Sequence, residues 1–355
     1  FAARELAAAL GQMCGRRVGM GMRAAPAGGV SLLLGAAADR AAGPQAPKLA
    51  EDEIDVAQVG PAALALRGGG PRGPLYAVCE VLESLGVRWY HPEVTVIPRR
   101  SAVTLPGRLR ARPAFEYREA YWAPLSDDKR FAARLRINGS IIGVPSAMGG
   151  HWGWEPYVHT FFKIVPPARY AGRHPDYYSF RRGQGRVVQG GQLCLSHPDV
   201  LDLFTAFALE QMADPDVRIV DISQMDCANP CECPACAAKD RRAGSPAGSL
   251  LAACNEVAAR TSRVHPDKFI GTLAYTYTLV PPRGMVAHPN VIVRLCHMNN
   301  ECQTHPLDGC AANRAFLDAL RRSPISLTIP LLSFTPVIAT LLAWIFRGQV
   351  PSAMQ

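Results

Sequence analysis

After residue 113, short apolar segments alternate with segments of helical spacing, and this alternation constrains the fold of the chain more than any other feature. Strands are predicted at residues 115–121, 140–144, 192–195, 217–226, 269–278 and 291–296, and helices at 127–136, 198–212, 249–264 and 313–322. Such alternation is typical of a parallel sheet, because each crossover between parallel strands needs room for a helix. The series predicts an α/β fold with a (β/α)8-type TIM barrel, truncated after about six strands.

A smaller α/β domain is predicted ahead of the barrel, over residues 1–112. Residues 1–20 have the spacing of an amphipathic helix, with Leu6, Leu10 and Met13 on one face. Short strands are expected at 30–34, 55–66 and 87–90, and a helix at 75–85 that Gly86 terminates. The partial barrel then covers residues 113–322 and a hydrophobic tail covers 323–355.

The tail contains an uncharged stretch, 325–346, which is flanked by Arg321, Arg322 and Arg347. Its length would span a bilayer, so any membrane association is expected through this stretch alone. Two prolines, Pro330 and Pro336, interrupt it. A buried hydrophobic tail or an out-of-frame end is the alternative interpretation.

The balance of charge argues against a nucleic-acid partner. The formal net charge is +9, but the excess is almost entirely arginine, and the arginines are scattered along the chain. They form no basic stripe with interleaved aromatic residues, which is the pattern of a nucleic-acid surface. Because 48% of the residues are hydrophobic and 19% are charged, a packed core is expected.

Active sites of barrel enzymes lie where the strands end, so the residues after each predicted strand are candidates for substrate contact. These positions combine aromatic rings, which stack on sugar faces, with polar groups that bind hydroxyls. Two arginines could bind an acidic or hydroxyl-rich sugar through paired hydrogen bonds. The predicted substrate-binding residues are Arg118, His151, Trp152, His159, Tyr275, Tyr277 and Arg294.

Two carboxylates at predicted strand ends, Asp226 and Glu301, are the candidate catalytic pair. Glycoside cleavage uses two carboxylates as acid and base or as acid and nucleophile, and we expect Asp226 to donate the proton. A structural role remains open for both: Asp226 could cap a helix or hold its loop, and Glu301 could be an ordinary loop carboxylate. No phosphate-binding loop or GxSxG elbow is present, and no cofactor is expected.

Four cysteines crowd the loop after the predicted fourth strand: Cys227, Cys231, Cys233 and Cys236. The spacing resembles a zinc knuckle but lacks two separated CxxC pairs, so Cys231, Cys233 and Cys236 are an alternative metal set only. In an oxidising compartment, disulfides that pin this loop, either internally or to the cysteines after the sixth strand, fit equally well. Disulfides, a metal and free thiols all remain open.

Several segments together resemble the bacterial domain-of-unknown-function family 4838. They are residues 174–178 (HPDYY), 191–195 (GQLCL), 222–226 (ISQMD) with Cys231, Cys233 and Cys236, 244–251 (GSPAGSLL), 273–277 (LAYTY) and 293–296 (VRLC). Residues 82–92 (LESLGVRWYHP) are similar to the non-catalytic domain that precedes the barrel in α-glucuronidases and β-hexosaminidases.

The resemblance implies a barrel related to those glycoside hydrolases, acting on complex glycans, including those that bear uronic acids. A carbohydrate substrate favours an extracellular or periplasmic location. Two other functions fit the same sequence: a catalytically silent carbohydrate-binding protein on the same scaffold, or a zinc protein built on the cysteine loop. From residue 323 onward the chain departs from the family pattern, which continues with a seventh strand.

Overall fold

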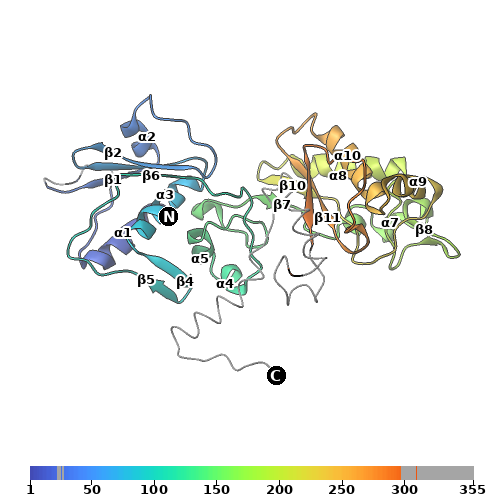
Figure 1. Ribbon diagram of the computed structural model, residues 1–355, viewed down its shortest axis with the longest axis horizontal. Coiled ribbons are helices and arrows are strands. Elements are labelled where there is room, and N and C mark those ends of the chain that lie inside the picture. The colour runs from blue at the N-terminus through green and yellow to red at the C-terminus, as the bar shows by residue number, and fades with distance from the viewer. Residues whose placement is uncertain (22–24, 26–27, 297–308, 310–355) are drawn as a thin grey trace, which may run out of the picture. The chain divides into compact units, whose positions relative to one another are not determined.

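The structure is a computed structural model that describes residues 1–21, 25, 28–296 and 309 (Figure 1). Its contacts divide the chain into two compact units. Within the described residues, the first unit is Phe1–His151 and the second begins at Trp152. Each unit has its own hydrophobic core, so the two are described separately.

The first unit is built on a four-stranded sheet in the order β1-β3-β2-β6. Its strands are β1 (Ser31–Leu34), β2 (Ile54–Gly60), β3 (Ala63–Gly68) and β6 (Arg108–Ala111). Only β1 and β3 run parallel; the other pairs are antiparallel. The helix α2 (Ala36–Ala42) lies on one face, and α3 (Gly73–Ser84) with α1 (Ala2–Cys14) lies on the other (Figure 1).

The predicted amphipathic faces of this unit are confirmed. Leu6, Leu10 and Met13 of α1 are buried, and so are the apolar positions of α3, because the two helices pack against each other and against the sheet. The expected strand at 55–66 is two strands, β2 and β3, which pair antiparallel across a tight turn. A hairpin of β4 (Arg88–His91) and β5 (Val94–Val96) follows α3.

The first unit continues well past the boundary that the sequence placed at residue 112. The helices α4 (Ala123–Asp127) and α5 (Lys129–Arg134) contribute Leu125 and Phe131 to the same core as α1 and α3. A single-turn helix, η1 (Ser146–Met148), comes shortly before the end of the unit. Residues 113–151 therefore complete the first unit.

The second unit is built on a fully parallel four-stranded sheet in the order β12-β11-β10-β7. Its strands are β7 (Gly153–Trp154), β10 (Val217–Asp221), β11 (Phe269–Ala274) and β12 (Val291–Leu295). Between β7 and β10 lie the short helices α6 (Phe161–Ile164), α7 (Pro167–Tyr170) and η2 (Pro175–Tyr177), the hairpin β8 (Ser179–Arg181) and β9 (Gly185–Val187), and α8 (Pro198–Met212). Two helices, α9 (Pro234–Ala243) and α10 (Ala247–Thr261), separate β10 from β11, and the turn η3 (Thr276–Thr278) follows β11.

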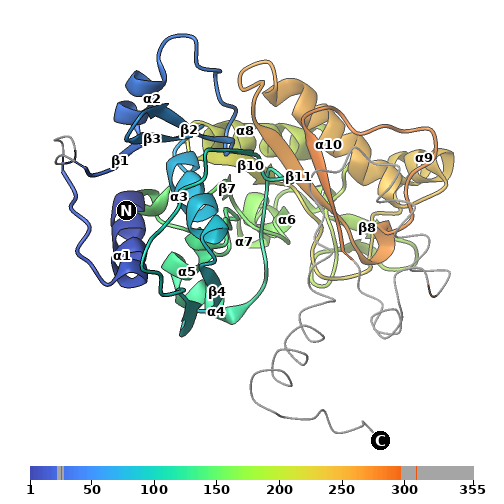
Figure 2. The same ribbon diagram turned by 60° about the vertical axis from the view of Figure 1, so that its left-hand side comes forward.

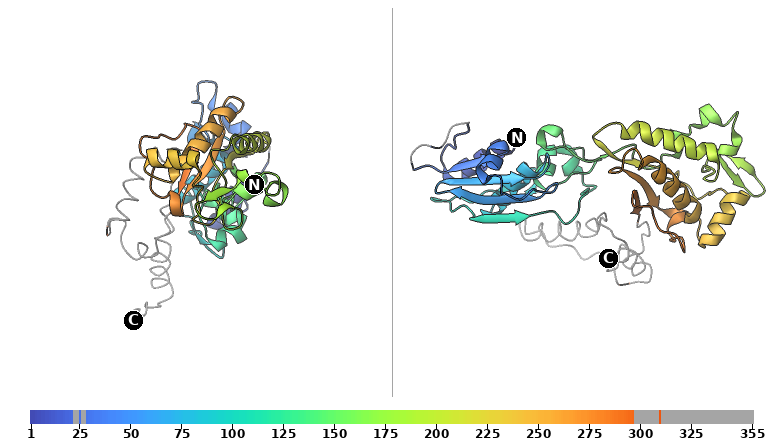
Figure 3. Two further views of the ribbon diagram at one scale, coloured as in Figure 1. Left: turned by 90° about the vertical axis from the view of Figure 1, so that its right-hand side faces the viewer. Right: turned by 90° about the horizontal axis from the view of Figure 1, so that it is seen from above.

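The two faces of this sheet differ in chemistry. The helices α8 and α10 cover one face of the sheet (Figures 2 and 3). Val220 and Ile270 of the sheet form one core with the apolar side chains of these helices. On the opposite face lie Trp154, Asp221 and Arg294, because strand side chains alternate between the two faces. Polar and aromatic residues therefore occupy the face away from the helices.

The parallel α/β architecture is confirmed, whereas a closed barrel is not seen in the described residues. Two of the expected strands are wrong: residues 115–121 are irregular and residues 140–144 form turns, both within the first unit. Residues 192–195 form only an isolated bridge, between Leu193 and Tyr178. The sheet runs from β7 to β12 without joining at its edges.

Some predictions fall outside the described residues. These are the helix at 313–322, the tail at 325–346 and the catalytic candidate Glu301. In the part of the chain that the structure describes, no helix is both long enough and apolar enough to cross a membrane.

Candidate functional site at the carboxyl edge of the parallel sheet

The strands of the second unit all end at the same edge, because they are parallel. The loop after β7 carries Tyr157 and His159, and the loop after β10 carries Ser223 and Asp226. Tyr275 follows β11 directly. In open parallel sheets this edge is where ligands bind.

The loops after β7 and β10 are joined by a compact set of hydrogen bonds. Thr160 Oγ1 donates to the backbone oxygen of Asp221 (2.8 Å) and accepts from the backbone N–H of Ser223 (3.0 Å). The backbone N–H of His159 donates to Ser223 Oγ (2.8 Å). Both Thr160 and Ser223 are fully buried, so these bonds are shielded from water and fix the loops to each other.

Gln224 connects the loop after β10 to the turn after β11. Its side-chain amide donates to the backbone oxygen of Tyr275 (3.1 Å) and to Thr278 Oγ1 (2.8 Å). Thr278 Oγ1 also accepts from the backbone N–H of Tyr275 (3.0 Å). Hydrogen bonds therefore connect the loops after three neighbouring strands with one another.

The imidazole of His159 is held in a defined tautomer. Its Nδ1 lies 2.7 Å from the backbone oxygen of Gln224. Because a carbonyl oxygen only accepts, Nδ1 carries the hydrogen, which leaves Nε2 of the neutral ring as an acceptor. The residue has a positive φ of 54°, and Val158 before it has 33°. Such backbone strain in non-glycine residues is concentrated at functional sites.

Asp226 and Tyr275, two of the predicted site residues, are brought together. Tyr275 Oη donates to Asp226 Oδ1 at 2.7 Å, and this bond raises the pKa of Tyr275 above its ordinary value. The Asp226 side chain is exposed, and the ring of Tyr275 lies 5.7 Å from the ring of His159. An accessible carboxylate thus accepts a hydrogen bond from one of two neighbouring rings at this edge of the sheet.

Beneath these residues lies a buried carboxylate, Asp221, the last residue of β10. Trp154 Nε1 donates to Asp221 Oδ2 at 3.3 Å, and Ser223 Oγ donates to Oδ1. Burial raises the pKa of Asp221 to about 6, although these two donors and the positive charge of Arg294 act in the opposite direction.

Arg294 contacts two aromatic rings. Its guanidinium carbon is 3.9 Å from the centre of the Trp154 ring and 4.2 Å from that of Tyr157. These contacts match cation–π geometry and hold the charge next to Asp221. In the part of the chain that the structure describes, one terminal nitrogen of Arg294 has no hydrogen-bond partner.

Three other predicted substrate-binding residues are not part of these loops. Arg118 belongs to the first unit, where Arg136, Asp52, Tyr76 and backbone oxygens accept from its guanidinium nitrogens. His151 also belongs to that unit, and its Nδ1 lies 2.9 Å from the backbone oxygen of Val144. Trp152 precedes β7, so it lies at the amino end of the sheet, with Arg218 over its ring.

Tyr277, the last predicted substrate-binding residue, lies in the turn η3. Burial raises the pKa of its hydroxyl above the ordinary value, and the nearby Cys227, Asp240 and Cys236 act in the same direction. The side chain therefore lies near the cysteine loop.

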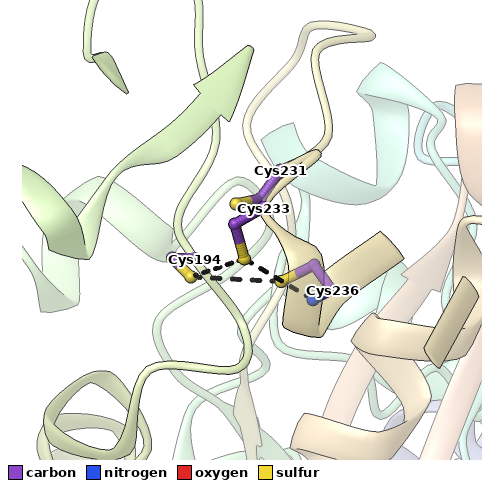
Figure 4. A group of neighbouring side chains, drawn as sticks. All are labelled: Cys194, Cys231, Cys233 and Cys236. Carbon is purple, nitrogen blue, oxygen red and sulfur yellow. Dashed lines mark hydrogen bonds between the residues drawn. The ribbon is translucent and has the colours of Figure 1, made fainter. Parts of the chain in front are cut away.

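A second cluster in this unit contains four buried cysteines, Cys194, Cys231, Cys233 and Cys236 (Figure 4). Their sulfur atoms all lie within 4.8 Å of one another. Hydrogen bonds from the thiols of Cys231 and Cys236 hold the pKa of Cys194 well below its ordinary value. The described cysteines are all free, so the disulfides that were one of the three alternatives are not found among them.

Two residues of these clusters were missed by the sequence prediction. Cys194 lies far from the cysteine loop along the chain, and it reaches the cluster only in the folded structure, next to the bridge between Leu193 and Tyr178. Asp221 was hidden because the strand was expected to run to residue 226, whereas it ends at Asp221. A charged residue that ends an apolar run would have been the signal for Asp221.

Comparison with protein families assigns this chain to a family. Residues 89–326 match the family described as Domain of unknown function (DUF4838), which is more than half of the chain. The chain belongs to this family. The match confirms the resemblance to family 4838, and it begins within the first unit at β4. No match was found among curated proteins.

Proposed function

We propose that this member of family DUF4838 binds glycans at the carboxyl edge of the second unit and cleaves their glycosidic bonds. The observation that carries the proposal is the hydrogen bond between Tyr275 and the exposed Asp226, which joins the ends of two neighbouring parallel strands. In this proposal the four strands are part of a (β/α)8-type barrel, whose active sites lie at this edge.

The role of Asp226 follows from its hydrogen bond. Tyr275 Oη donates its hydrogen bond to Asp226 Oδ1, so Asp226 is the acceptor of this pair. A catalytic acid must carry the proton itself, whereas a base or nucleophile must be ionised. We therefore assign Asp226 as base or nucleophile, and its partner Glu301, which follows β12 in the sequence, as proton donor. This reverses the roles expected from the sequence.

The substrate class is an acidic or hydroxyl-rich sugar. Arg294 carries a positive charge on the face of the sheet that bears Trp154 and Asp221. Its terminal nitrogen without a partner among the described residues is a donor for a carboxylate or hydroxyl. The rings of Trp154 and Tyr157 are covered by Arg294, which leaves Tyr275 and His159 to contact the sugar.

The test is turnover on a library of neutral and uronic-acid-bearing glycans. Asp226→Asn is expected to lower kcat by about a hundredfold or more, because it removes the charged group at the reacting centre. Tyr275→Phe should lower kcat by a smaller factor, since it removes only the donor to Asp226. Asp216→Asn is the matched control, because Asp216 is exposed at the opposite end of β10.

The outcomes separate the functions. Turnover that falls in Asp226→Asn and persists in Asp216→Asn supports cleavage at this edge. Equal turnover in the wild type and Asp226→Asn contradicts the assignment of Asp226. Glycan binding by the wild type with no turnover of any library member would instead identify a silent carbohydrate-binding protein.

A further inference from the structure

We propose that Cys194, Cys231, Cys233 and Cys236 bind one zinc ion with tetrahedral thiolate coordination. The cluster lies in the second unit, and the inference does not depend on the glycan site. It adds Cys194 to the three cysteines that the sequence offered as an alternative metal set.

The spacing of the sulfur atoms fits this ion. Cys194 Sγ lies 3.6 Å from Cys233 Sγ and 4.0 Å from Cys236 Sγ (Figure 4). With Zn–S bonds of about 2.3 Å, the edges of a tetrahedral site are about 3.8 Å long. A disulfide would bring two sulfur atoms to about 2.05 Å. An iron–sulfur cubane would hold the thiolates farther apart, because its inorganic core lies between them.

The surroundings suit thiolates. The backbone N–H of Phe180 donates to Cys231 Sγ at 3.3 Å, and that of Cys236 donates to Cys233 Sγ at 3.5 Å. Cys233 is the N-cap of α9 and Cys236 lies in its first turn, where the helix dipole favours negative charge. Such outer contacts orient the ligands of a metal site and offset the negative charge of four thiolates.

All four side chains are buried, as the ligands of a closed structural site are. The ion would join the segment before α8, which carries Cys194, to the loop between β10 and α9. Gln192 already connects these segments, since its side-chain amide donates to the backbone oxygens of Met225 (3.0 Å) and Cys227 (2.8 Å). A metal at the cluster would add a second connection between the same two segments.

The experiment is metal analysis of the full chain, purified under reducing conditions without chelators. We expect about one zinc per chain in the wild type. Cys194→Ser and Cys236→Ser should each lower the zinc content by about tenfold, because each removes one ligand. Cys227→Ser is the matched control: it lies in the same loop, and its sulfur accepts from Gln192 at 3.1 Å, outside the four-thiol cluster.

A second measurement avoids variants that fail to fold. Exchange of the bound ion for Co²⁺ in the wild type should give the strong visible bands and thiolate charge-transfer absorption of a tetrahedral sulfur site. Weak bands of octahedral cobalt, stoichiometric iron in place of zinc, or no metal in folded wild-type chain would each overturn the proposal. So would an intact mass that shows the four cysteines paired as disulfides, or zinc loss in Cys227→Ser equal to that in Cys194→Ser.

Discussion

At the scale of single residues, the sequence predicted the exposed part of the site better than its buried part. Asp226 and Tyr275 were both expected at strand ends, and the structure joins them by a hydrogen bond. Asp221 and Cys194 depend on contacts between distant segments, which a single sequence does not display. Arg118 was chosen as a candidate because a strand was expected at 115–121. That segment is irregular, and Arg118 forms an ion pair with Asp52 within the first unit.

The buried Asp221 predicts a pH dependence of stability. Its folded-state pKa is raised from 3.8 to about 6, so its contribution to stability is fully present below about pH 4 and is lost as the pH rises through 6. That shift corresponds to at most about 3 kcal/mol. We expect the wild type to lose stability relative to Asp221→Asn across this window, as measured by urea unfolding between pH 4 and 8.

The groups around Asp221 are part of this expectation. Trp154 and Ser223 donate to its carboxylate, and the charge of Arg294, joined by that of His159 when its ring is protonated, opposes the effect of burial. Asp216→Asn, at an exposed aspartate, should follow the wild type at every pH. Parallel curves for the wild type and Asp221→Asn would contradict a raised pKa.

At the scale of elements, hydrophobic periodicity predicted helices and long strands. It failed for elements that are very short or that lack a regular pattern of apolar residues. The helix at 198–212 is α8, with the predicted ends. The strand β7 has two residues, too few for any periodicity, and α9 lies in a stretch that reads as a cysteine loop. Residues 140–144 form turns, and their apolar character has another reason than a strand: Ile142 and Val144 are buried in the core of the first unit.

The fit between β11 and β7 gives a prediction at this scale. A Cβ added to Gly271 would lie 2.8 Å from a ring carbon of Trp154 and 3.0 Å from Ile219 Cγ2, which is too close. Gly271→Ala should therefore push Trp154 away from Asp221 and lower the free energy of unfolding by about 1–3 kcal/mol.

The control is another glycine in a strand. A Cβ at Gly60 in β2 would meet only the Ala63 side chain, at 3.9 Å, so Gly60→Ala should be close to neutral. Urea unfolding of both variants measures the difference. Equal stability of Gly271→Ala and the wild type would mean that Trp154 is not held against Asp221 as described.

At the scale of the whole chain, the decisive correction is where the first unit ends. Arginines from residues 113–151 pair with acidic groups of the earlier segment: Arg118 with Asp52, Arg130 and Arg134 with Glu5, and Arg136 with Glu80 and Glu83. Glu5 and Asp52 are buried, so a chain that stops at 112 would leave them without these partners. Loss of the partner of a buried charge is strongly destabilising.

Two fragments test this boundary. We expect 1–151 to unfold cooperatively on heating and 1–112 to be unfolded or several kcal/mol less stable, because burial of Leu125 and Phe131 alone contributes about 1.5–3 kcal/mol each. Glu5→Gln in 1–151 separates the two causes: it removes the charge that Arg130 and Arg134 neutralise and keeps the apolar contacts. If 1–112 were as stable as 1–151, residues 113–151 would not belong to the first unit. The family match, which begins at residue 89, would then begin in a domain that folds without them.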